Sequence, residues 1–449
     1  MGKLMIGSAM GDITPERPAV LAGSMWVRRA DGIIDPVYTG AVVIDNGDKR
    51  VVFVSCDLCF LPDEIHFKLR RDISCATGTK PESVTISCTH THNGPSICRC
   101  LPDIEVDRDI AETIFSKIIK TARDASMKMV PARMFYGRSK VKATFNRRMI
   151  VEGNKVIMSP GPQDPPVKAP EGPADEDLQV IWFKDLDGNM VSTIINFSSH
   201  PTLTLGENKI SADFPGVIRR VVNKQLGYFP VLYFQGACGN TSPIDFSVPE
   251  NLSADRLEIM DKTGKLLGDT VLNIIGNSSN MYEDITINGF SSLICAPARH
   301  AGREDLSVEE ACRYLEEHPI DKTDMSDINT MIDRYFAEWI IRLEGSGYFI
   351  ESYPVEISAF HLGDVAIVTV PAELFVEYQL EIKKLSPFAN TMVWELTNGY
   401  CGYVPTERAL QNGSYETRLA ISSKLSPRAG EMIVNTSLDL LKQLKQSTS

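Results

Sequence analysis

The sequence lacks any long apolar segment. No uninterrupted hydrophobic run approaches the roughly 20 residues that a membrane-spanning helix needs. The N-terminal stretch has one early lysine, and Gly and Ser interrupt its apolar residues before an expected strand, so it does not look like a secretory signal. We therefore expect a cytoplasmic protein with no membrane span.

Clusters of basic residues are also missing. The net charge of -12 is spread along the chain, and no Lys/Arg-rich run offers a surface for phosphate backbones, which excludes nucleic acid as an expected partner. Hydrophobic residues make up 43% and charged residues 23% of the chain, values that exclude a disordered or fibrous protein. The composition is that of an ordinary globular protein.

The ten cysteines lack the dense spacing of a small disulfide-rich secreted protein. Cys56 and Cys59 form a Cys-x-x-Cys pair and Cys98 and Cys100 a Cys-x-Cys pair, but neither has a partner pair at zinc-ribbon spacing. We expect buried or inert thiols in a reducing compartment.

Strand-like and helix-like patterns alternate along the chain. Its 449 residues allow two domains or one large layered domain, and neither an internal repeat nor a convincing linker divides them. We predict a layered, mixed-sheet α/β fold in a single catalytic domain over residues 1–449. The predicted strands are 39–44, 51–55, 83–88, 178–183, 190–196, 231–234 and 365–370, and the predicted helical segments are 63–74, 107–122, 307–343 and 371–384.

One segment, residues 158–177, is rich in proline. Proline removes a backbone donor and interrupts both helices and strand ladders. We therefore predict an ordered loop or lid over this segment.

The first chemically informative motif is Thr-His-Thr-His-Asn-Gly-Pro at residues 89–95, directly after an apolar strand. A strand end that bends into a loop can send His90 and His92 in different directions, so that one binds a metal and the other acts as an acid, base or oxyanion donor. A hydrogen-bonded pair of histidines would give the same pattern. The motif alone leaves both readings open.

His200 also follows a buried strand, and it precedes a proline. Catalytic zinc typically takes three protein ligands, mixing His with carboxylate, and keeps a position for water. The composition does not choose the carboxylate. The candidates are Glu207, Asp213, Glu373 and Glu377.

The loop at residues 236–243 holds two glycines, a hydroxyl pair and a proline after another apolar strand. Such a loop can bring backbone N–H groups and Ser242 to a reacting carbonyl, although a tight structural turn has the same composition. The Gly-x-Ser-x-Gly motif is absent, which argues against the serine elbow of α/β-hydrolases.

Together these motifs resemble the catalytic domain of the neutral/alkaline non-lysosomal ceramidase family, zinc amidases that cleave an N-acyl linkage. Residues 89–95 look like the family's Thr-His-Thr-His-Ser-Gly-Pro, which implies His90 as a zinc ligand and His92 as a catalytic helper. Residues 196–200 resemble the motif of the second zinc histidine, which implies His200. The family's Pro-Gly-Glu resembles Pro-Ala-Glu at residues 371–373 and implies Glu373 as the carboxylate ligand.

The resemblance extends to the C-terminal part of the chain. The family's Tyr-x-x-Tyr motif and later Tyr-Glu-Gly are similar to residues 397–406 and 415–416, which implies Tyr403 as a fourth zinc ligand and Tyr415 as a carbonyl or oxyanion donor. Individually, Tyr400, Tyr403 and Tyr415 are more typical of packing residues. An Asn-Arg pair implies that Arg147 holds a substrate oxygen.

The loop at residues 239–243 departs from the family's motif at one acidic position. The family's Gly-Asp-Val-Ser-Pro appears here as residues 239–243 with Asn240 in place of Asp, and Ser242 is expected as a hydrogen-bond donor or a nucleophile. Asp12 and Asp57, near strand ends, are further candidates for orienting the site.

The resemblance implies a hydrolase with one Zn²⁺ per chain that cleaves a linear amide through an activated water. Ceramidases of the family are exported and carry a C-terminal immunoglobulin-like domain, whereas we expect neither here. We therefore expect a small-molecule or lipid-like, amphiphilic N-acyl substrate rather than ceramide. A zinc esterase or lactonase and a non-catalytic zinc-binding relative are the alternatives, and the oligomeric state is open, a homo-oligomer included.

Overall fold

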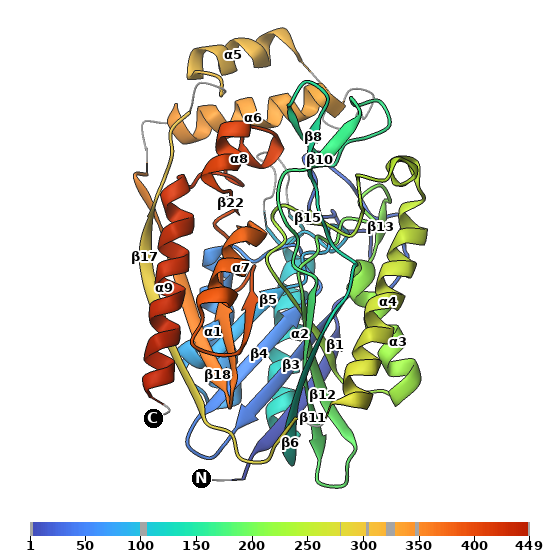
Figure 1. The fold of residues 1–449 in the computed structure, drawn as a ribbon, viewed down its shortest axis with the longest axis vertical. Helices are drawn as coiled ribbons and strands as arrows, with labels where there is room; N and C mark the ends of the chain where they lie inside the picture. The colour runs from blue at the N-terminus through green and yellow to red at the C-terminus, as the bar shows by residue number, and fades with distance from the viewer. Residues whose placement is uncertain are drawn as a thin grey trace.

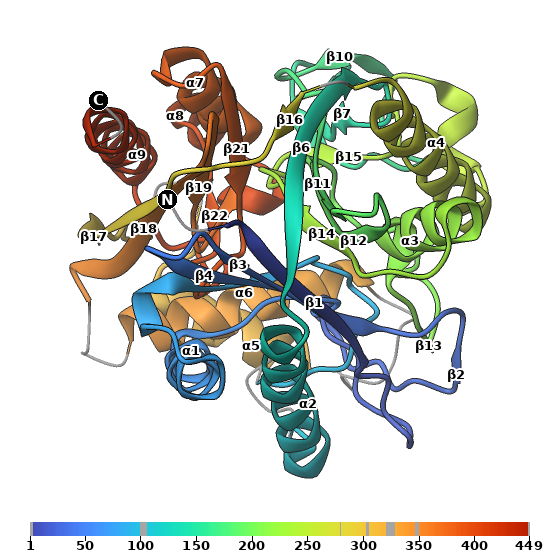
Figure 2. The same cartoon turned by 90° about the horizontal axis from the view of Figure 1, so that it is seen from below.

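Two β-sheets packed face to face form the centre of the computed structural model, and helices cover the outer face of each sheet (Figures 1 and 2). The structure describes residues 3–98, 106–278, 280–301, 305–319, 328–345 and 350–447. Within these ranges, no helix is both long and apolar enough to cross a membrane. This layered, mixed α/β arrangement confirms the predicted fold class.

The large sheet has the strand order β14-β12-β11-β6-β1-β3-β4-β5, with β16 paired to β6. It mixes antiparallel pairs with two parallel ones, β12 with β14 and β4 with β5. Its strands are β1 (Met5–Asp12), β3 (Tyr38–Asp45), β4 (Arg50–Cys56), β5 (Val84–Cys88), β6 (Val130–Lys140), β11 (Asp177–Asp185), β12 (Met190–Phe197), β14 (Val231–Gln235) and β16 (Met281–Tyr282).

Alternating side chains of these strands enter two different cores. In β4, Val52 and Val54 face the outer helices, whereas Phe53 faces the second sheet. Because successive side chains of a strand point to opposite faces, a strand buried on both faces reads as a continuous apolar run. This explains why the buried strands were recognisable from the sequence.

Two pairs of helices cover the outer face of the large sheet (Figure 2). Helix α2 (Arg108–Met127) packs against β1 and β3, and α1 (Asp63–Thr77) packs against β5 and α2. Asp107 caps α2 by accepting hydrogen bonds from the Asp109 and Ile110 amides. Helices α3 (Asp213–Leu226) and α4 (Arg256–Asn277) pack on the β6, β11 and β14 side.

The second sheet has the order β17-β18-β19-β21. Trp394 stacks on Phe234 of the large sheet with ring centroids 3.9 Å apart, so the two sheets share an aromatic core. Helices α7 (Val376–Leu385) and α9 (Pro427–Gln446) cover the other face. The strands are β17 (Ile287–Pro297), β18 (Ser352–Leu362), β19 (Val365–Thr369) and β21 (Asn390–Trp394).

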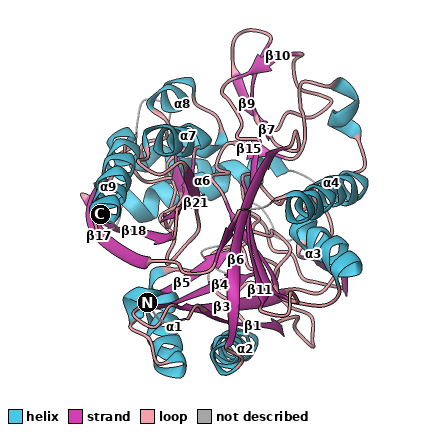
Figure 3. Cartoon of the chain, turned by 60° about the horizontal axis from the view of Figure 1, so that its bottom comes forward, coloured by secondary structure: helices cyan, strands magenta, loops and turns pink. Residues whose placement is uncertain are grey.

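The remaining elements gather at one end of the molecule, at the top of Figure 1. There α5 (Val308–Glu317) packs on α6 (Ile328–Glu344), near α8 (Glu407–Asn412). Short paired strands tie the connecting loops together, as Figure 3 shows for several of them. They are β2 (Gly32–Ile33) with β13 (Lys209–Ile210), β7 (Phe145–Asn146) with β15 (Thr241–Ser242), β20 (Glu373–Leu374) with β22 (Tyr403–Val404), and β10 (Val167–Pro170) with β8 (Arg148–Val151), which also pairs with β9 (Val156–Met158).

Two segment predictions need correction. The proline-rich segment 158–177 is not loop throughout, because β10 within it pairs antiparallel with β8. The helix predicted over 371–384 begins only at Val376, because residues 373–374 form β20. Residues 307–343 contain α5 and α6, and residues 320–327 between them lie outside the described ranges, as does Cys100.

Candidate active site

The cavity that His90 and His92 line has a volume of about 430 Å³, and His200 is buried behind them. His90 follows β5 and His200 follows β12 of the large sheet, and Glu373 stands in β20, the short strand just after β19 of the second sheet, so segments that leave both sheets meet at this place. The lining includes His90, His92, Glu373, Tyr400, Tyr403 and Tyr415.

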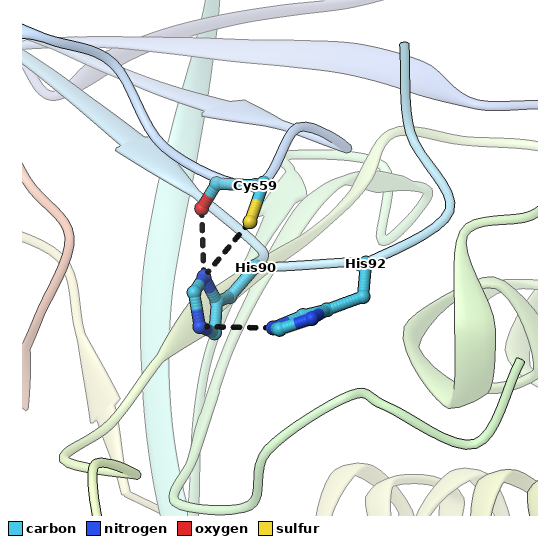
Figure 4. A group of neighbouring side chains, drawn as sticks. All are labelled: Cys59, His90 and His92. Carbon is cyan, nitrogen blue, oxygen red and sulfur yellow. Dashed lines mark hydrogen bonds between the residues drawn. The ribbon is translucent and has the colours of Figure 1, made fainter. Parts of the chain in front are cut away.

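The imidazole of His90 is held by the backbone of Cys59. Its Nδ1 lies 2.8 Å from the Cys59 carbonyl oxygen and 3.6 Å from Cys59 Sγ (Figure 4). A carbonyl oxygen only accepts hydrogen bonds, so Nδ1 carries the proton and the lone pair of Nε2 is available. His90 itself has a positive φ of 69°, an uncommon conformation that turns the chain directly after the strand.

The other two histidines are oriented in the same way. His92 Nδ1 lies 2.6 Å from the Gly23 carbonyl oxygen and His200 Nδ1 lies 3.1 Å from that of Cys238. The Nε2 atom of His92 is 3.3 Å from that of His90 and 3.0 Å from that of His200. Burial lowers the pKa of both His92 and His200 well below the usual value, so both imidazoles are neutral. Nitrogen lone pairs from all three rings therefore converge.

Glu373 adds a carboxylate to these nitrogens. Its Oε2 lies 3.2 Å from His90 Nε2 and 4.0 Å from His200 Nε2, and its Oε1 accepts a hydrogen bond of 2.7 Å from the Tyr400 hydroxyl. Burial alone would raise the pKa of Glu373, but its interaction with His90 and hydrogen bonds from neighbouring side chains lower it to about 2. The carboxylate is therefore ionised.

This donor set fits a zinc ion. Ligand atoms bonded to zinc at about 2.0–2.1 Å in a tetrahedron lie about 3.3 Å from one another. Among the three predicted ligands, Glu373 Oε2 lies 3.2 Å from His90 Nε2, which matches this spacing, and 4.0 Å from His200 Nε2, which is wider. All three ligand atoms lie within 4.8 Å of one another, and His92 Nε2 lies 3.0 to 3.3 Å from the other two histidines. Neutral nitrogen lone pairs repel each other at such distances unless a cation or a proton lies between them, and each ring has the second hydrogen bond typical of a metal ligand.

Tyr403 stands beside Glu373 because β22 pairs with β20 in a register that sets these two residues opposite each other. Its hydroxyl oxygen accepts a hydrogen bond of 3.1 Å from Arg147 Nη2. Arg147 is buried, and it also donates to the Gly239 carbonyl at 2.8 Å and to Glu416 at 3.2 Å. It is not among the described residues that line the cavity. Its guanidinium positions Tyr403 in this structure, and its expected contact with a substrate oxygen stays a prediction.

The two remaining predicted site residues, Tyr415 and Ser242, lie in different surroundings. Tyr415 lines the cavity, and its ring packs edge-on to that of Tyr403 with centroids 6.1 Å apart. Ser242 is buried in β15, its Oγ accepts a hydrogen bond of 3.2 Å from the Ile244 amide, and it is absent from the described lining of the cavity. In this structure Ser242 thus stabilises the tight turn, and its expected role as hydrogen-bond donor or nucleophile stays a prediction.

The other acidic candidates take part in contacts elsewhere. Glu207 lies 3.8 Å from Lys209, and Glu377 accepts a hydrogen bond from Asn240. Asp213 accepts hydrogen bonds from Thr204 and the Phe214 amide. Asp12 caps its own exposed turn and Asp57 pairs with Arg219, so neither has the orienting role expected for it.

Sequence reasoning missed Glu395, which lies beneath the site. Its carboxyl oxygens accept hydrogen bonds from the Cys238 amide at 3.0 Å and the Leu374 amide at 2.7 Å. It thereby joins the residue whose carbonyl orients His200 to the residue that follows Glu373. Burial raises the pKa of Glu395 well above the usual value. Its position directly after a buried strand was the only signal in the sequence.

Aromatic side chains form much of the rest of the cavity wall. Phe60 stacks on Tyr400 with centroids 4.1 Å apart, and α6 contributes Tyr335 and Trp339. These residues come from three distant segments, and nothing in their local sequence singles them out. The cavity therefore joins a polar, metal-competent end to an aromatic wall.

Comparison with known proteins agrees with this description. A family model described as neutral/alkaline non-lysosomal ceramidase, N-terminal, matches residues 4–231. Neutral ceramidase of Pseudomonas aeruginosa is 25% identical over 253 residues, which cover 53% of this chain and 36% of that protein. Neutral ceramidase B of Dictyostelium discoideum is 26% identical over 241 residues, which cover 47% of this chain and 33% of that protein. The match thus spans about a third of these relatives.

Solved structures show the same fold over the whole chain. The crystal structure of the neutral ceramidase from Pseudomonas aeruginosa has a TM-score of 0.73 at 17% identity and covers 100% of this chain and 75% of that one. A ceramidase complexed with C2 has a TM-score of 0.75 at 18% identity and covers 100% of this chain and 76% of that one.

Proposed function

Because the chain belongs to the neutral/alkaline non-lysosomal ceramidase family, we propose that it is a zinc-dependent hydrolase of linear N-acyl amides. The observation that carries this proposal is the convergence of three Nε2 atoms and the Glu373 carboxylate, with His90, His92 and Glu373 lining one cavity. A structural zinc site is closed by its protein ligands, whereas this site lines a cavity of about 430 Å³ that a substrate can enter.

His90, His200 and Glu373 would hold the metal, with Tyr403 as the fourth ligand that the family resemblance implies. Zinc at this place supplies Lewis acidity, which lowers the pKa of a water toward about 7 and polarises the scissile carbonyl. The backbone carbonyls of Cys59 and Cys238 hold the two imidazoles in the tautomer that presents Nε2.

The remaining groups of the site act on water and substrate. His92 is fixed by the Gly23 carbonyl, so its Nε2 lone pair can accept a hydrogen bond from the attacking water. Tyr415 lines the cavity as a protonated phenol, which can donate to the developing oxyanion or to the leaving nitrogen. Arg147 holds the Tyr403 hydroxyl from behind.

The cavity supports a small or amphiphilic substrate. A volume of about 430 Å³ lies near the lower end of the roughly 300–1,000 Å³ typical of small-molecule sites. Its aromatic wall suits an acyl chain, while Glu373 and the histidines surround the amide. We infer a shorter N-acyl compound rather than ceramide.

The test is hydrolysis of matched substrates by the zinc-loaded chain. We expect release of free amine from hexanoyl-propylamide, and a loss of about 100-fold or more in kcat/KM for Glu373→Gln, because that change weakens metal binding and removes a charge beside the reacting carbonyl. Glu377→Gln is the matched control, since Glu377 is close in sequence but bonds to Asn240.

The same assay separates the alternatives. Turnover of propyl hexanoate with no detectable turnover of the amide would replace the amidase proposal with an esterase. A zinc-loaded chain that cleaves neither substrate would indicate a non-catalytic zinc-binding protein.

A further inference from the structure

A buried lysine stands in the wall of the active-site cavity, and the proposed reaction does not use it. Lys424 is 5% exposed and lines the cavity that also contains Glu373. Its Nζ donates hydrogen bonds of 3.0 Å to the carbonyl oxygens of Cys401 and Ile421 and lies 4.9 Å from the centre of the Tyr353 ring. An ammonium has three donors, so one N–H is left for a further acceptor.

No carboxylate of the described residues lies within 4.0 Å of this ammonium. Asp63 and Glu64 line the same cavity, but Asp63 acts on Lys424 only over a longer distance. Burial lowers the pKa of Lys424, and the interactions with Cys401 and Asp63 partly oppose that effect. A buried charge without an ion-pair partner is costly, so its presence in a ligand cavity indicates an anion-binding role.

A second cavity of about 280 Å³ adjoins the first and shares Tyr353, Ile421 and Lys424 with it. It brings two more cations, Arg299 and Arg342, to the same place. Arg299 Nε is buried without a hydrogen-bond partner, while Nη1 lies 3.5 Å from Asp305 and Nη2 donates to the Ser423 carbonyl at 2.9 Å and hydroxyl at 3.0 Å.

The only acidic residue in the described lining of this second cavity is Glu344, whose carboxylate is engaged by the Ala301 amide and lies 3.5 Å from His300. Positive charge therefore dominates this side of the active-site cavity.

We propose that Lys424 and the adjoining arginines form a subsite for an anionic group of the substrate, with Lys424 as the specificity-determining residue. This proposal rests on the proposed amide hydrolysis and narrows its substrate class to N-acyl amides that carry a carboxylate or a similar anion. The anion can come from the amine part, as in an N-acylated amino acid, or from the acyl part, as in a dicarboxylic acid monoamide. The charged contact is the same in both cases.

The experiment measures binding rather than turnover, so it tests the anion subsite even if the chain hydrolyses no amide. Calorimetry on the full-length protein, as isolated and after chelation, compares N-hexanoylglycine with its neutral counterpart N-hexanoylglycinamide and with adipic acid mono-propylamide. We expect one of the two acids to bind about tenfold or more tightly than the neutral amide, the effect of a hydrogen bond to a charged group. The chelated sample removes any contribution of a carboxylate bound to metal.

Lys424→Met should abolish this preference, whereas Lys424→Arg should retain part of it. Lys442→Met is the matched control, because Lys442 is an exposed lysine of α9 that pairs with Asp439. If Lys424→Met does not fold, salt titration of the wild type decides, since screening weakens binding of the acid and not of the neutral amide.

Equal affinity for acids and neutral amide in the wild type, or a preference that survives Lys424→Met, would overturn the anion subsite. Loss of hydrolysis with an intact binding preference would instead contradict the proposed function alone.

Discussion

At the scale of single residues, the site depends on groups that hold its ligands as much as on the ligands. Three backbone carbonyls fix the tautomers of the three histidines, Tyr400 fixes the Glu373 carboxylate, and Arg147 fixes Tyr403. Glu395 is buried below them and accepts two backbone N–H groups. Such supporting groups typically contribute about 10- to 100-fold to metal affinity.

Glu395→Gln tests this support. A glutamine presents one NH₂ group toward a backbone N–H, so one of the hydrogen bonds becomes a contact between two donors. We predict a loss of about 1–3 kcal/mol in the free energy of unfolding and about 10-fold weaker zinc binding. Urea denaturation and competition with a chelator measure the two effects. Glu381→Gln, at an exposed position, is the control. If Glu395→Gln leaves the zinc affinity unchanged, the role of Glu395 is limited to stability.

Asp35 offers a prediction for the dependence of stability on pH. Burial raises its pKa from 3.8 to about 6, although Ser211 donates a hydrogen bond to it. The folded state therefore binds the proton more tightly than the unfolded state, and stability falls as pH rises from about 4 to 6. Asp35→Asn should add about 1–2 kcal/mol to the free energy of unfolding at pH 7 and almost nothing at pH 4. An equal effect of the substitution at both pH values would contradict this assignment.

At the scale of secondary-structure elements, α6 contributes the aromatic wall of the cavity through Tyr335 and Trp339. The helix packs on α5, and both helices lie at one end of the molecule, at the top of Figure 1. Through these two residues α6 adds an apolar surface to the cavity that His90, His92 and Glu373 also line.

Trp339→Ala tests the acyl-chain role of α6. Removing a large buried apolar contact costs about 1.5–3 kcal/mol, so kcat/KM for a hexanoyl amide should fall about 10-fold or more while that for an acetyl amide changes little. Phe67→Ala is the control, because Phe67 is an exposed aromatic of α1. A parallel decrease for both chain lengths would place the acyl chain elsewhere.

The elements that the sequence predicted best are those whose pattern is local. The helix expected at 107–122 is α2, Arg108–Met127, since its apolar spacing and its Asp107 cap both lie within the segment. The pairing of β10 with β8 and of β20 with β22 was missed, because these short strands exist only through partners distant in the chain. The same reason hid Glu395 and the true contacts of Arg147, whereas the histidines stood in recognisable motifs.

At the scale of the whole molecule, the site needs both sheets. The family model covers residues 4–231, which supply His90, His92 and His200, whereas Glu373, Tyr403 and Tyr415 come from the second half of the chain. Trp394, which directly precedes Glu395 in the chain, packs against both Phe234 and Phe53 of the large sheet. The packing between the sheets therefore sets the distance between the histidines and the carboxylate.

The central claim, that these residues form one zinc site, is tested most directly by the metal content of the purified full-length protein. We predict about one zinc per chain in the wild type and in the Glu377→Ala control, and almost none in His90→Ala and Glu373→Ala. A wild type that cannot be loaded with zinc, or variants that retain the full amount, would contradict the account.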